Sequence, residues 1–292
     1  MDALDRGSRD HVSRSLPIDP LNTQDHVPLI WIQRSPIMTK TTIDVATVAS
    51  LTHEEAMRLQ AHELDRTLAL LRSLDDAAWN TRTDCPAWDV SAMYKHVLGA
   101  CEAGASMREN IHQLRRARAH RKQHGGPLEA ALSNLQVSER ADLSPQQIVE
   151  RLAAIAPKTV RGRSRIPGFV RSRARMAIDG PVFETWTLGY LIDTIYLRDL
   201  WMHRVDVGHA LNQPVELRSE HDGRIVADVV AEWGRRHGKP FSLDLTGPAG
   251  GTYAHDQDAP EVDQISMDAV EFCRTLAGRR QATGLLATVV PF

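Results

Sequence analysis

The sequence predicts an α+β protein in which a four-helix bundle is followed by a small C-terminal α/β unit. Four segments carry apolar residues at helical spacing, and together they offer enough apolar faces for a bundle. Beyond residue 212 the pattern changes to short alternating stretches around a glycine-rich turn. A chain of 292 residues is long enough for both units. We expect a disordered tail at residues 1–50, the bundle at 51–212 and the α/β unit at 213–292.

The composition is that of an ordinary soluble globular protein, with 42% hydrophobic and 25% charged residues. A formal net charge of −2 excludes a global attraction to nucleic acid or anionic lipid. No apolar run could cross a bilayer, and the charged N-terminal stretch lacks the apolar core of a secretory signal. Cys85, Cys101 and Cys273 are odd in number and widely spaced, which indicates a reducing compartment. We expect a cytoplasmic protein without a nucleic-acid or membrane partner.

The tail and the first helix are separated by a clear start signal. Residues 1–50 mix charges and prolines without a sustained period, and translation could begin at Met38. Thr52 can cap the first helix, and Glu55 three residues later would complete a capping box. The apolar stripe of this helix ends near Asp75.

The second helix is predicted to begin after Asp89, a suitable N-cap, and to extend to Met107. The basic run Arg115–His124 is expected to fray from that helix into a loop that ends at Gly125.

Two more helices complete the predicted bundle. Ser144 precedes a proline, a typical helix start, and the helix is expected to reach about Pro157. Residues 158–182 are rich in Arg, Gly and Pro and are predicted to form a long loop. The longest apolar helix is expected at 183–211.

The C-terminal unit is predicted from its own pattern. A helix is expected at 219–236, followed by a hairpin of two strands near 241–245 and 251–254. A closing helix is expected at 266–276.

The residues that carry chemistry lie on two bundle helices. Asp199 and His203 are four residues apart, so both side chains project from one helix face. His96 lies among apolar residues of the second helix, where a buried imidazole needs a partner. Two imidazoles and one carboxylate form an ordinary zinc ligand set with one open position. The plainer alternative is that His203 forms an ion pair with Asp199 while His96 is a hydrogen-bonded core residue.

Several motifs together are similar to those of a known family. Residues 83–90 (TDCPAWDV) followed by His96, and residues 199–206 (DLWMHRVD), resemble the two motifs of the DinB-like bundle in the mycothiol-dependent maleylpyruvate isomerase family. The turn at 245–251 (LTGPAGG) and residues 272–279 (FCRTLAGR) resemble the sterol-carrier-like C-terminal domain of that family.

The resemblance implies a metal site and a thiol cofactor. His96, Asp199 and His203 would be the metal ligands, with zinc as the expected ion, and Arg279 would be a catalytic residue facing the substrate or the thiol. The family's acidic ligand is commonly Glu, so the shorter Asp199 requires a closer approach of its helix. Mycothiol would be the cofactor.

The implied reaction begins with addition of the thiolate to an activated double bond. Rotation about the resulting single bond and elimination then give a cis–trans isomerase. Transfer of the thiol to a small electrophilic or carboxylate substrate would instead give an S-transferase. A non-catalytic metal- or ligand-binding bundle is the competing class, because fold alone does not fix function.

Other candidate residues have weaker support. Cys85 precedes a proline in a loop, and no neighbouring signal indicates a lowered thiol pKa, so we predict a structural role. The arginines at 163–175 could contact an anionic substrate or nucleic acid. The absence of interleaved aromatic residues argues against base stacking.

Overall fold

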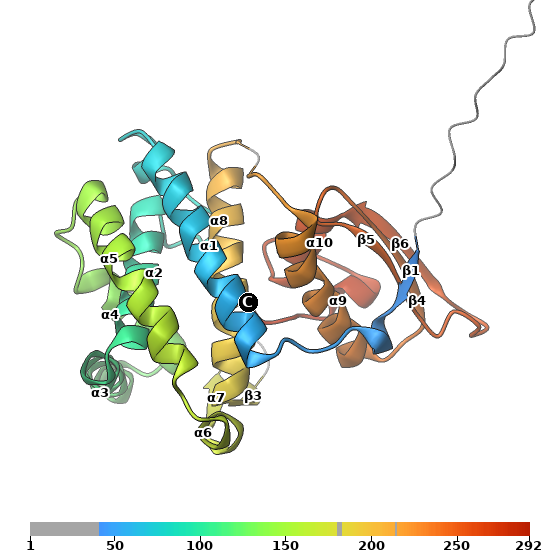
Figure 1. Ribbon diagram of the computed structural model, residues 1–292, viewed down its shortest axis with the longest axis horizontal. Helices are drawn as coiled ribbons and strands as arrows, with labels where there is room; N and C mark the ends of the chain where they lie inside the picture. The colour runs from blue at the N-terminus through green and yellow to red at the C-terminus, as the bar shows by residue number, and fades with distance from the viewer. Residues whose placement is uncertain (1–40, 180–182, 214) are drawn as a thin grey trace, which may run out of the picture. The chain divides into compact units, whose positions relative to one another are not determined.

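A computed structural model describes residues 41–179, 183–213 and 215–292. Four helices form the bundle (Figure 1): α1 (His53–Ser73), α2 (Val90–Ala105), α5 (Pro145–Ser164) and α8 (Tyr196–Ala210). They enclose an apolar core that includes Leu64, Met93 and Leu152, all nearly fully buried. The C-terminal part combines a four-stranded sheet with two helices. The predicted α+β class is therefore confirmed.

Helix α8 belongs to two cores at once. Leu200 and Val207 on one face pack into the bundle core. Trp201 and Val205 on another face pack against the C-terminal helices and sheet. Accordingly α8 stands between the other bundle helices and the C-terminal elements (Figure 1). The boundary at residue 212 remains a prediction.

The N-terminal caps follow the sequence with one exception. Thr52 Oγ1 accepts a hydrogen bond from Glu55 N at 3.2 Å, and Asp89 Oδ1 accepts one from Ala92 N at 2.8 Å, as predicted. The prediction of a capping box at Thr52 is wrong, because the Glu55 carboxylate forms an ion pair with Arg224 instead. This pair ties the start of α1 to the C-terminal part.

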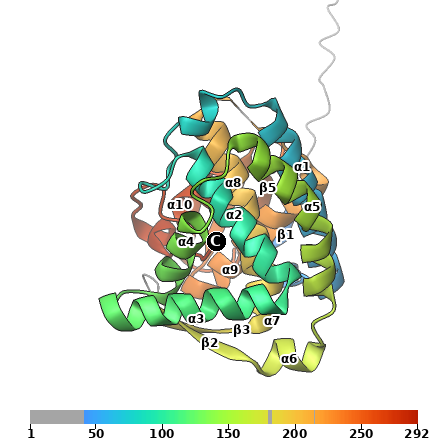
Figure 2. The same ribbon diagram turned by 90° about the vertical axis from the view of Figure 1, so that its left-hand side faces the viewer.

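The region after α2 is more helical than predicted. The basic run does not fray: α3 (Met107–His124) is one helix, because Ser106 ends α2 and caps α3 through a 3.3 Å bond from Glu109 N. A second, unpredicted helix, α4 (Leu128–Ser138), follows the turn at Gly125. The two helices lie side by side (Figure 2).

Helix α5 passes through Pro157 and ends at Ser164, so its predicted end is wrong. Pro157 removes one backbone donor, but later residues of α5 have polar anchors in the bundle. Thr159 Oγ1 donates to the Cys101 carbonyl at 2.7 Å, and Arg163 donates to Gln60 Oε1 at 2.8 Å. These buried contacts outweigh the single lost backbone bond.

The end of α5, a short helix and a hairpin replace the described part of the predicted loop, and the hairpin also replaces the start of the predicted last helix. After α6 (Gly168–Arg173), strands β2 (Arg175–Asp179) and β3 (Phe183–Thr187) pair antiparallel. The FETWT sequence of β3 is rich in aromatic and β-branched residues, which favours a strand over a helix. Helical structure begins only at α7 (Leu188–Tyr190) and reaches α8 through a π-helical turn, Leu191–Ile195.

The C-terminal sheet has the order β1-β5-β4-β6. The predicted hairpin is confirmed, but the closing helix starts later than expected, because residue 266 lies in a strand and Asp268 caps the helix. The elements are a π-helical turn (Ser219–Gly223), α9 (Arg224–His237), β4 (Phe241–Thr246), β5 (Gly251–His255), β6 (Asp263–Asp268) and α10 (Ala269–Leu276). Short 3-10 helices occur at Val45–Thr47, Ala78–Asn80 and Gly284–Ala287.

Part of the predicted tail is a strand. β1 (Thr42–Asp44) pairs in parallel with β5 at the edge of the sheet, so the expectation of disorder is wrong for these residues. The β-branched Thr42 and Ile43 suit such a strand. Residues 1–40 of the predicted tail lie outside the described residues.

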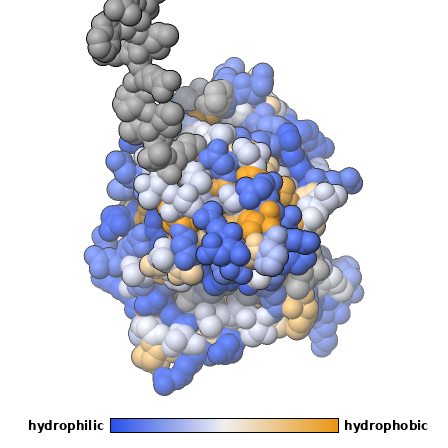
Figure 3. Space-filling model, turned by 90° about the vertical axis from the view of Figure 1, so that its right-hand side faces the viewer, coloured by the Kyte–Doolittle hydropathy of each residue, from blue (hydrophilic) through white to orange (hydrophobic). Residues whose placement is uncertain are grey.

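The sheet buries one face. Phe241, Leu243 and Leu245 alternate along β4 and pack in the core with α9 and α10, while Ser242 and Asp244 point the other way. Figure 3 looks onto this side of the molecule, where hydrophilic residues surround a small hydrophobic area.

A buried ion network joins α1 and α8 to the start of α9. Arg204 Nε donates to Glu63 at 2.5 Å, and Arg204 Nη2 donates to Asp222 at 2.6 Å. Trp201 Nε1 also donates to Asp222, at 2.8 Å, so this indole faces away from Asp199 and His203. No helix in the described ranges is long and apolar enough to cross a membrane.

Candidate metal centre and active site

The three predicted ligands meet between α2 and α8. His203 Nε2 lies 3.2 Å from Asp199 Oδ1, and His96 Nε2 lies 3.9 Å from Asp199 Oδ2. The imidazole rings of His96 and His203 are perpendicular, with centroids 5.6 Å apart. One donor atom from each residue lies within 4.8 Å of the others, which is the spacing of a metal ligand set.

Two glutamines fix the orientation of His96. Gln113 Nε2 donates to the Gly99 carbonyl at 3.0 Å, so its Oε1 faces Gln136 Nε2 at 2.9 Å. Gln136 Oε1 in turn faces His96 Nδ1 at 2.7 Å. Because a carbonyl oxygen can only accept, Nδ1 carries a proton, and Nε2 is the ring nitrogen that faces Asp199. In its neutral form a ring held in this way offers Nε2 to a metal.

His203 is buried without satisfied polar contacts. Neither ring nitrogen has a hydrogen-bond partner with good geometry among the described residues, although both are shielded from solvent. Burial disfavours its charged form, but the charges of Asp199 and Asp206 outweigh burial and raise the pKa of His203 to about 9. A site that attracts an extra positive charge in this way fits a cation, and its nitrogen and oxygen donors fit zinc.

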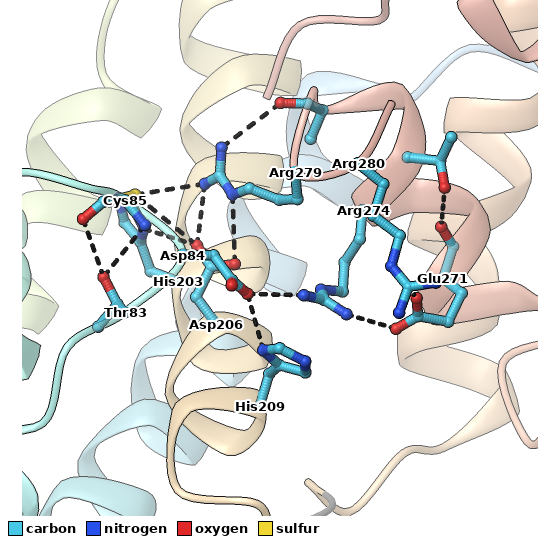
Figure 4. A network of polar contacts seen from close by, with 12 residues as sticks. Thr83, Asp84, Cys85, His203, Asp206, His209, Glu271, Arg274, Arg279 and Arg280 are labelled. Carbon is cyan, nitrogen blue, oxygen red and sulfur yellow. Dashed lines mark hydrogen bonds and ion pairs between the residues drawn. The ribbon is translucent and has the colours of Figure 1, made fainter. Parts of the chain in front are cut away.

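A second polar layer lies behind His203 (Figure 4). Asp206 is fully buried, and its Oδ2 lies 3.7 Å from His203 Nδ1. Arg279 donates to Asp206 from Nη2 at 2.9 Å and to Cys85 Sγ at 3.5 Å. Burial raises the pKa of the Cys85 thiol to about 11, although the charge of Arg279 acts in the opposite direction. This pKa is consistent with the structural role predicted for Cys85.

The loop that carries Cys85 is closed by its own side chains. Thr83 Oγ1 donates to the Trp88 carbonyl at 3.0 Å and accepts from Cys85 N at 3.2 Å. The Trp88 ring lies over the His96 ring with centroids 4.9 Å apart. The loop therefore shields one side of the candidate metal centre.

Asp84 fastens the same loop to α8 and α10 (Figure 4). Its Oδ2 accepts from Arg274 at 2.7 Å and lies 2.9 Å from His209 Nδ1. Arg274 is buried and also pairs with Glu271. Two C-terminal arginines, Arg274 and Arg279, thus reach the bundle around this loop.

A cavity of about 230 Å³ opens beside the centre. Asp199, His203 and Arg279 line it, so Arg279 lies beside the candidate centre, and its catalytic role stays a prediction. Much of the remaining lining is apolar and includes Met202 and Val290. Glu184, Trp186 and Arg236 add a second polar group to its wall.

The arginines at 163–175 do not line this cavity. Arg163 is buried, bonds Gln60 and lies over the Tyr196 ring at 4.0 Å. Arg171 pairs with Asp193 at 2.8 Å. These two side chains stabilise the bundle, and contact of the arginine run with a substrate stays a prediction.

Sequence reasoning missed Gln113, Gln136, Glu184, Trp186 and Arg236. The two glutamines gave a usable signal, since each is a polar residue on the inner face of its helix. The other three come from the unpredicted hairpin and from the end of α9, so only the tertiary fold places them beside α8.

Another buried donor cluster does not suit a metal. Glu63, His221 and Asp222 place donor atoms close together. Arg204 bonds both carboxylates and Arg66 bonds Asp222, so guanidinium groups already occupy the space that a cation would need.

Comparison with known proteins agrees with this architecture. The family model described as "Mycothiol maleylpyruvate isomerase N-terminal domain" matches residues 60–208, about half of the chain. The match includes all three candidate ligands. None of the curated proteins compared with this chain matches it.

Two solved structures share the fold. The crystal structure of the mycothiol-dependent maleylpyruvate isomerase is 18% identical, with a TM-score of 0.51 over 79% of this chain and 90% of that chain. A histidine-to-alanine mutant of the mycothiol-dependent maleylpyruvate isomerase is 17% identical, with a TM-score of 0.50 and the same coverage. The matches extend beyond the N-terminal domain into the C-terminal part, and the chain belongs to the mycothiol maleylpyruvate isomerase family.

Proposed function

We propose that this chain is a metal-dependent enzyme that uses mycothiol to act on a small electrophilic carboxylic acid. The reaction is thiol addition, followed by cis–trans isomerisation or by release of a thiol adduct. Family membership supports the choice of thiol, and the cavity beside the candidate centre supports a small substrate.

His96, Asp199 and His203 would hold one divalent cation, with zinc as the expected ion. A bound divalent cation supplies a positive charge that keeps a coordinated thiol deprotonated at neutral pH. Gln136 holds His96 with Nε2 free, and Asp206 lies where it can orient His203. These neighbours reduce the reorganisation needed for metal binding.

Arg279 would bind the carboxylate of the substrate. Its guanidinium is anchored to Asp206 through Nε at 3.3 Å and Nη2 at 2.9 Å, which fixes the plane of the group. The side chain is still 19% exposed on the cavity side. A guanidinium keeps donors for a second carboxylate when one partner is already bound. Nη1 also donates to the Ala277 carbonyl and Nη2 to Cys85, so Arg279 combines a fixed position with one remaining donor, on Nη1.

Apolar residues around the site keep water away from the reacting groups. Met202 and Val290 are buried, and both face the same cavity as His203. Trp88 covers His96 from the loop side. A low-dielectric environment strengthens the attraction between Arg279 and an anionic substrate.

The observation that carries the proposal is the contact between Gln136 and Nδ1 that orients His96. A histidine that is merely part of the core needs its ring nitrogens satisfied, whereas here one nitrogen is bonded and the other points into a carboxylate–histidine pair. Such an arrangement gathers nitrogen and oxygen donors that suit a divalent cation.

The test is consumption of maleylpyruvate by the metal-loaded protein with and without mycothiol, with products separated by chromatography. We expect turnover only with the thiol, and loss of at least about 100-fold in kcat/KM for Arg279→Met. Arg280→Met, at an exposed neighbouring position, is the matched control and should retain activity.

The products separate the reaction classes. A trans isomer with unchanged thiol concentration indicates an isomerase, and a stable thiol adduct indicates an S-transferase. If neither maleylpyruvate nor a panel of small electrophilic acids is consumed, the enzyme proposal is wrong and a binding protein remains.

A further inference from the structure

The cavity beside the candidate centre has a second polar wall that the proposed chemistry does not use. Glu184 and Trp186 come from strand β3, and Arg236 comes from the end of α9. All three line the same cavity as Asp199, His203 and Arg279. A ligand that fills the cavity would therefore contact both polar groups.

The second polar wall is held rigidly. Arg236 donates to Glu184 from both terminal nitrogens, at 2.6 and 3.2 Å, and Trp186 Nε1 donates to Glu184 Oε2 at 2.7 Å. The Trp186 ring also packs edge-on against Tyr190, with centroids 5.4 Å apart. Because each side chain is fixed by another, the wall is ready for a ligand without rearrangement.

Hydrogen-bonding capacity remains on this wall. Glu184 accepts three bonds, whereas a carboxylate has about four acceptor positions. Arg236 Nε donates to Glu232 at 2.8 Å, and Nη1 makes one bond out of two possible donors. Glu184 is 22% exposed and Arg236 24% exposed, so both can reach a ligand.

The charge around this wall disfavours a second carboxylate. Arg236 is bonded to two carboxylates, Glu184 and Glu232, and Glu232 also pairs with the buried Arg198 at 2.8 Å. Arg198 bonds a further carboxylate, Asp228, at 2.6 Å. Three carboxylates against two guanidinium groups leave an excess of one negative charge. An uncharged ligand with many hydroxyl groups fits this wall better than an anion.

We propose that Glu184, Trp186 and Arg236 form a subsite for the sugar-like, hydroxyl-rich portion of the thiol cofactor. This inference rests on the proposed use of mycothiol, whose cysteine is joined to an uncharged pair of polyhydroxylated rings. Glu184 and Arg236 bond the hydroxyl groups, and the Trp186 indole packs on the apolar face of a ring. The polar group on the other side of the cavity, Asp199, His203 and Arg279, holds the thiol end. The two polar groups together set the direction in which the cofactor binds.

The test compares two thiols on metal-loaded full-length protein by calorimetry. Mycothiol has the sugar-like portion, and N-acetylcysteine lacks it. We expect the wild-type protein to bind mycothiol at least about tenfold more tightly than N-acetylcysteine. Trp186→Ala should remove most of that difference and leave the affinity for N-acetylcysteine unchanged. Phe183→Ala, an exposed position on the same strand, is the matched control and should behave as wild type.

Glu184→Gln is a second variant that tests the subsite without removing the ring. It keeps the size of the side chain, and we expect it to weaken mycothiol binding severalfold at constant metal content. Wild type that binds both thiols equally would overturn the subsite and leave thiol dependence intact. Wild type that binds neither thiol would overturn the proposed function as well. Equal weakening of both thiols by Trp186→Ala would show a general structural role instead.

Discussion

His96 Nδ1 and Gln136 Oε1 lie 2.7 Å apart, and this contact joins the candidate metal centre to helix α4. The contact continues through Gln113 to the backbone carbonyl of Gly99. A backbone carbonyl cannot be flipped, so the orientation of both amides and the tautomer of His96 follow from it. Helix α4, which was not predicted from the sequence, thus orients His96 through the side chain of Gln136.

Replacement of Gln136 should weaken metal binding. Gln136→Met fills a similar volume but cannot accept a hydrogen bond, so either ring nitrogen of His96 can then carry the proton. We expect about a 10- to 100-fold loss of zinc affinity, measured by competition with a chromophoric chelator. Gln146→Met, on the exposed side of α5, is the control. Unchanged affinity in the Gln136 variant would contradict the orienting role.

Gly99 should tolerate no side chain. A Cβ atom there would lie 2.7 Å from Gln136 Cβ, closer than van der Waals contact permits. We expect Gly99→Ala to push α4 away from α2, to destabilise the fold by about 1–3 kcal/mol and to weaken zinc binding. Thermal unfolding and chelator competition measure the two effects. In Gly168→Ala, where a Cβ atom would meet only Arg171 Nη2 at 3.7 Å, neither property should change.

The buried carboxylate of Glu63 should make stability depend on acid. Burial disfavours the charged form, but the hydrogen bond with His221 and the charge of Arg204 outweigh it and lower the pKa of Glu63 from 4.5. A carboxylate with a lowered pKa in the folded state stabilises the fold above its ordinary pKa. This stabilisation is lost as the pH falls through the folded-state pKa.

In Glu63→Gln the free energy of unfolding should therefore depend less on pH in the acidic range. Removal of the charge leaves Arg204 without one of its two carboxylate partners, which we expect to cost about 3–5 kcal/mol at pH 7. Urea unfolding at a series of pH values provides the measurement. Glu54→Gln, exposed in the first turn of α1, should match wild type throughout. A Glu63 variant with the same stability at pH 7 would rule out this contribution.

Asp84 should control the mobility of the loop at residues 83–88. Asp84→Asn weakens its ion pairs with Arg274 and His209, and because Asp84 is 24% exposed we expect a stability loss of only about 1 kcal/mol. Hydrogen exchange of the loop amides should rise in this variant, with the helices of the bundle unchanged. Asp142→Asn, at an exposed position, serves as the control. Loop exchange equal to wild type would mean that the Thr83 contacts alone hold the loop.

Local signals in the sequence were sufficient for the main helices and for placing Asp199 and His203 on one helix face. A helical spacing places Asp199 and His203 on one face, and a bundle needs only short facing helices to bring His96 to them. The capping residues Thr52, Asp89 and Ser144 marked three helix starts because their side chains bond backbone amides locally.

Non-local contacts account for what the sequence did not predict. Strand β1 exists because β5 is beside it, and the helical path through Pro157 is supported by bonds to α1 and α2. The hairpin β2–β3 supplies two of the three residues of the second polar wall, but its strands are stable only when they pair with each other. The resemblance to a family identified the site more sharply than spacing did, since a pair of residues four apart on a helix is common by chance.

The most direct test of the central claim is the metal content of the purified protein, by elemental analysis, beside His203→Ala and the same-helix control His209→Ala. We predict about one divalent ion per chain in wild type and in the control, and loss of the ion together with mycothiol binding in His203→Ala. A wild-type protein that holds no divalent ion, even after incubation with zinc, would contradict the account and leave Asp199 and His203 as a structural pair.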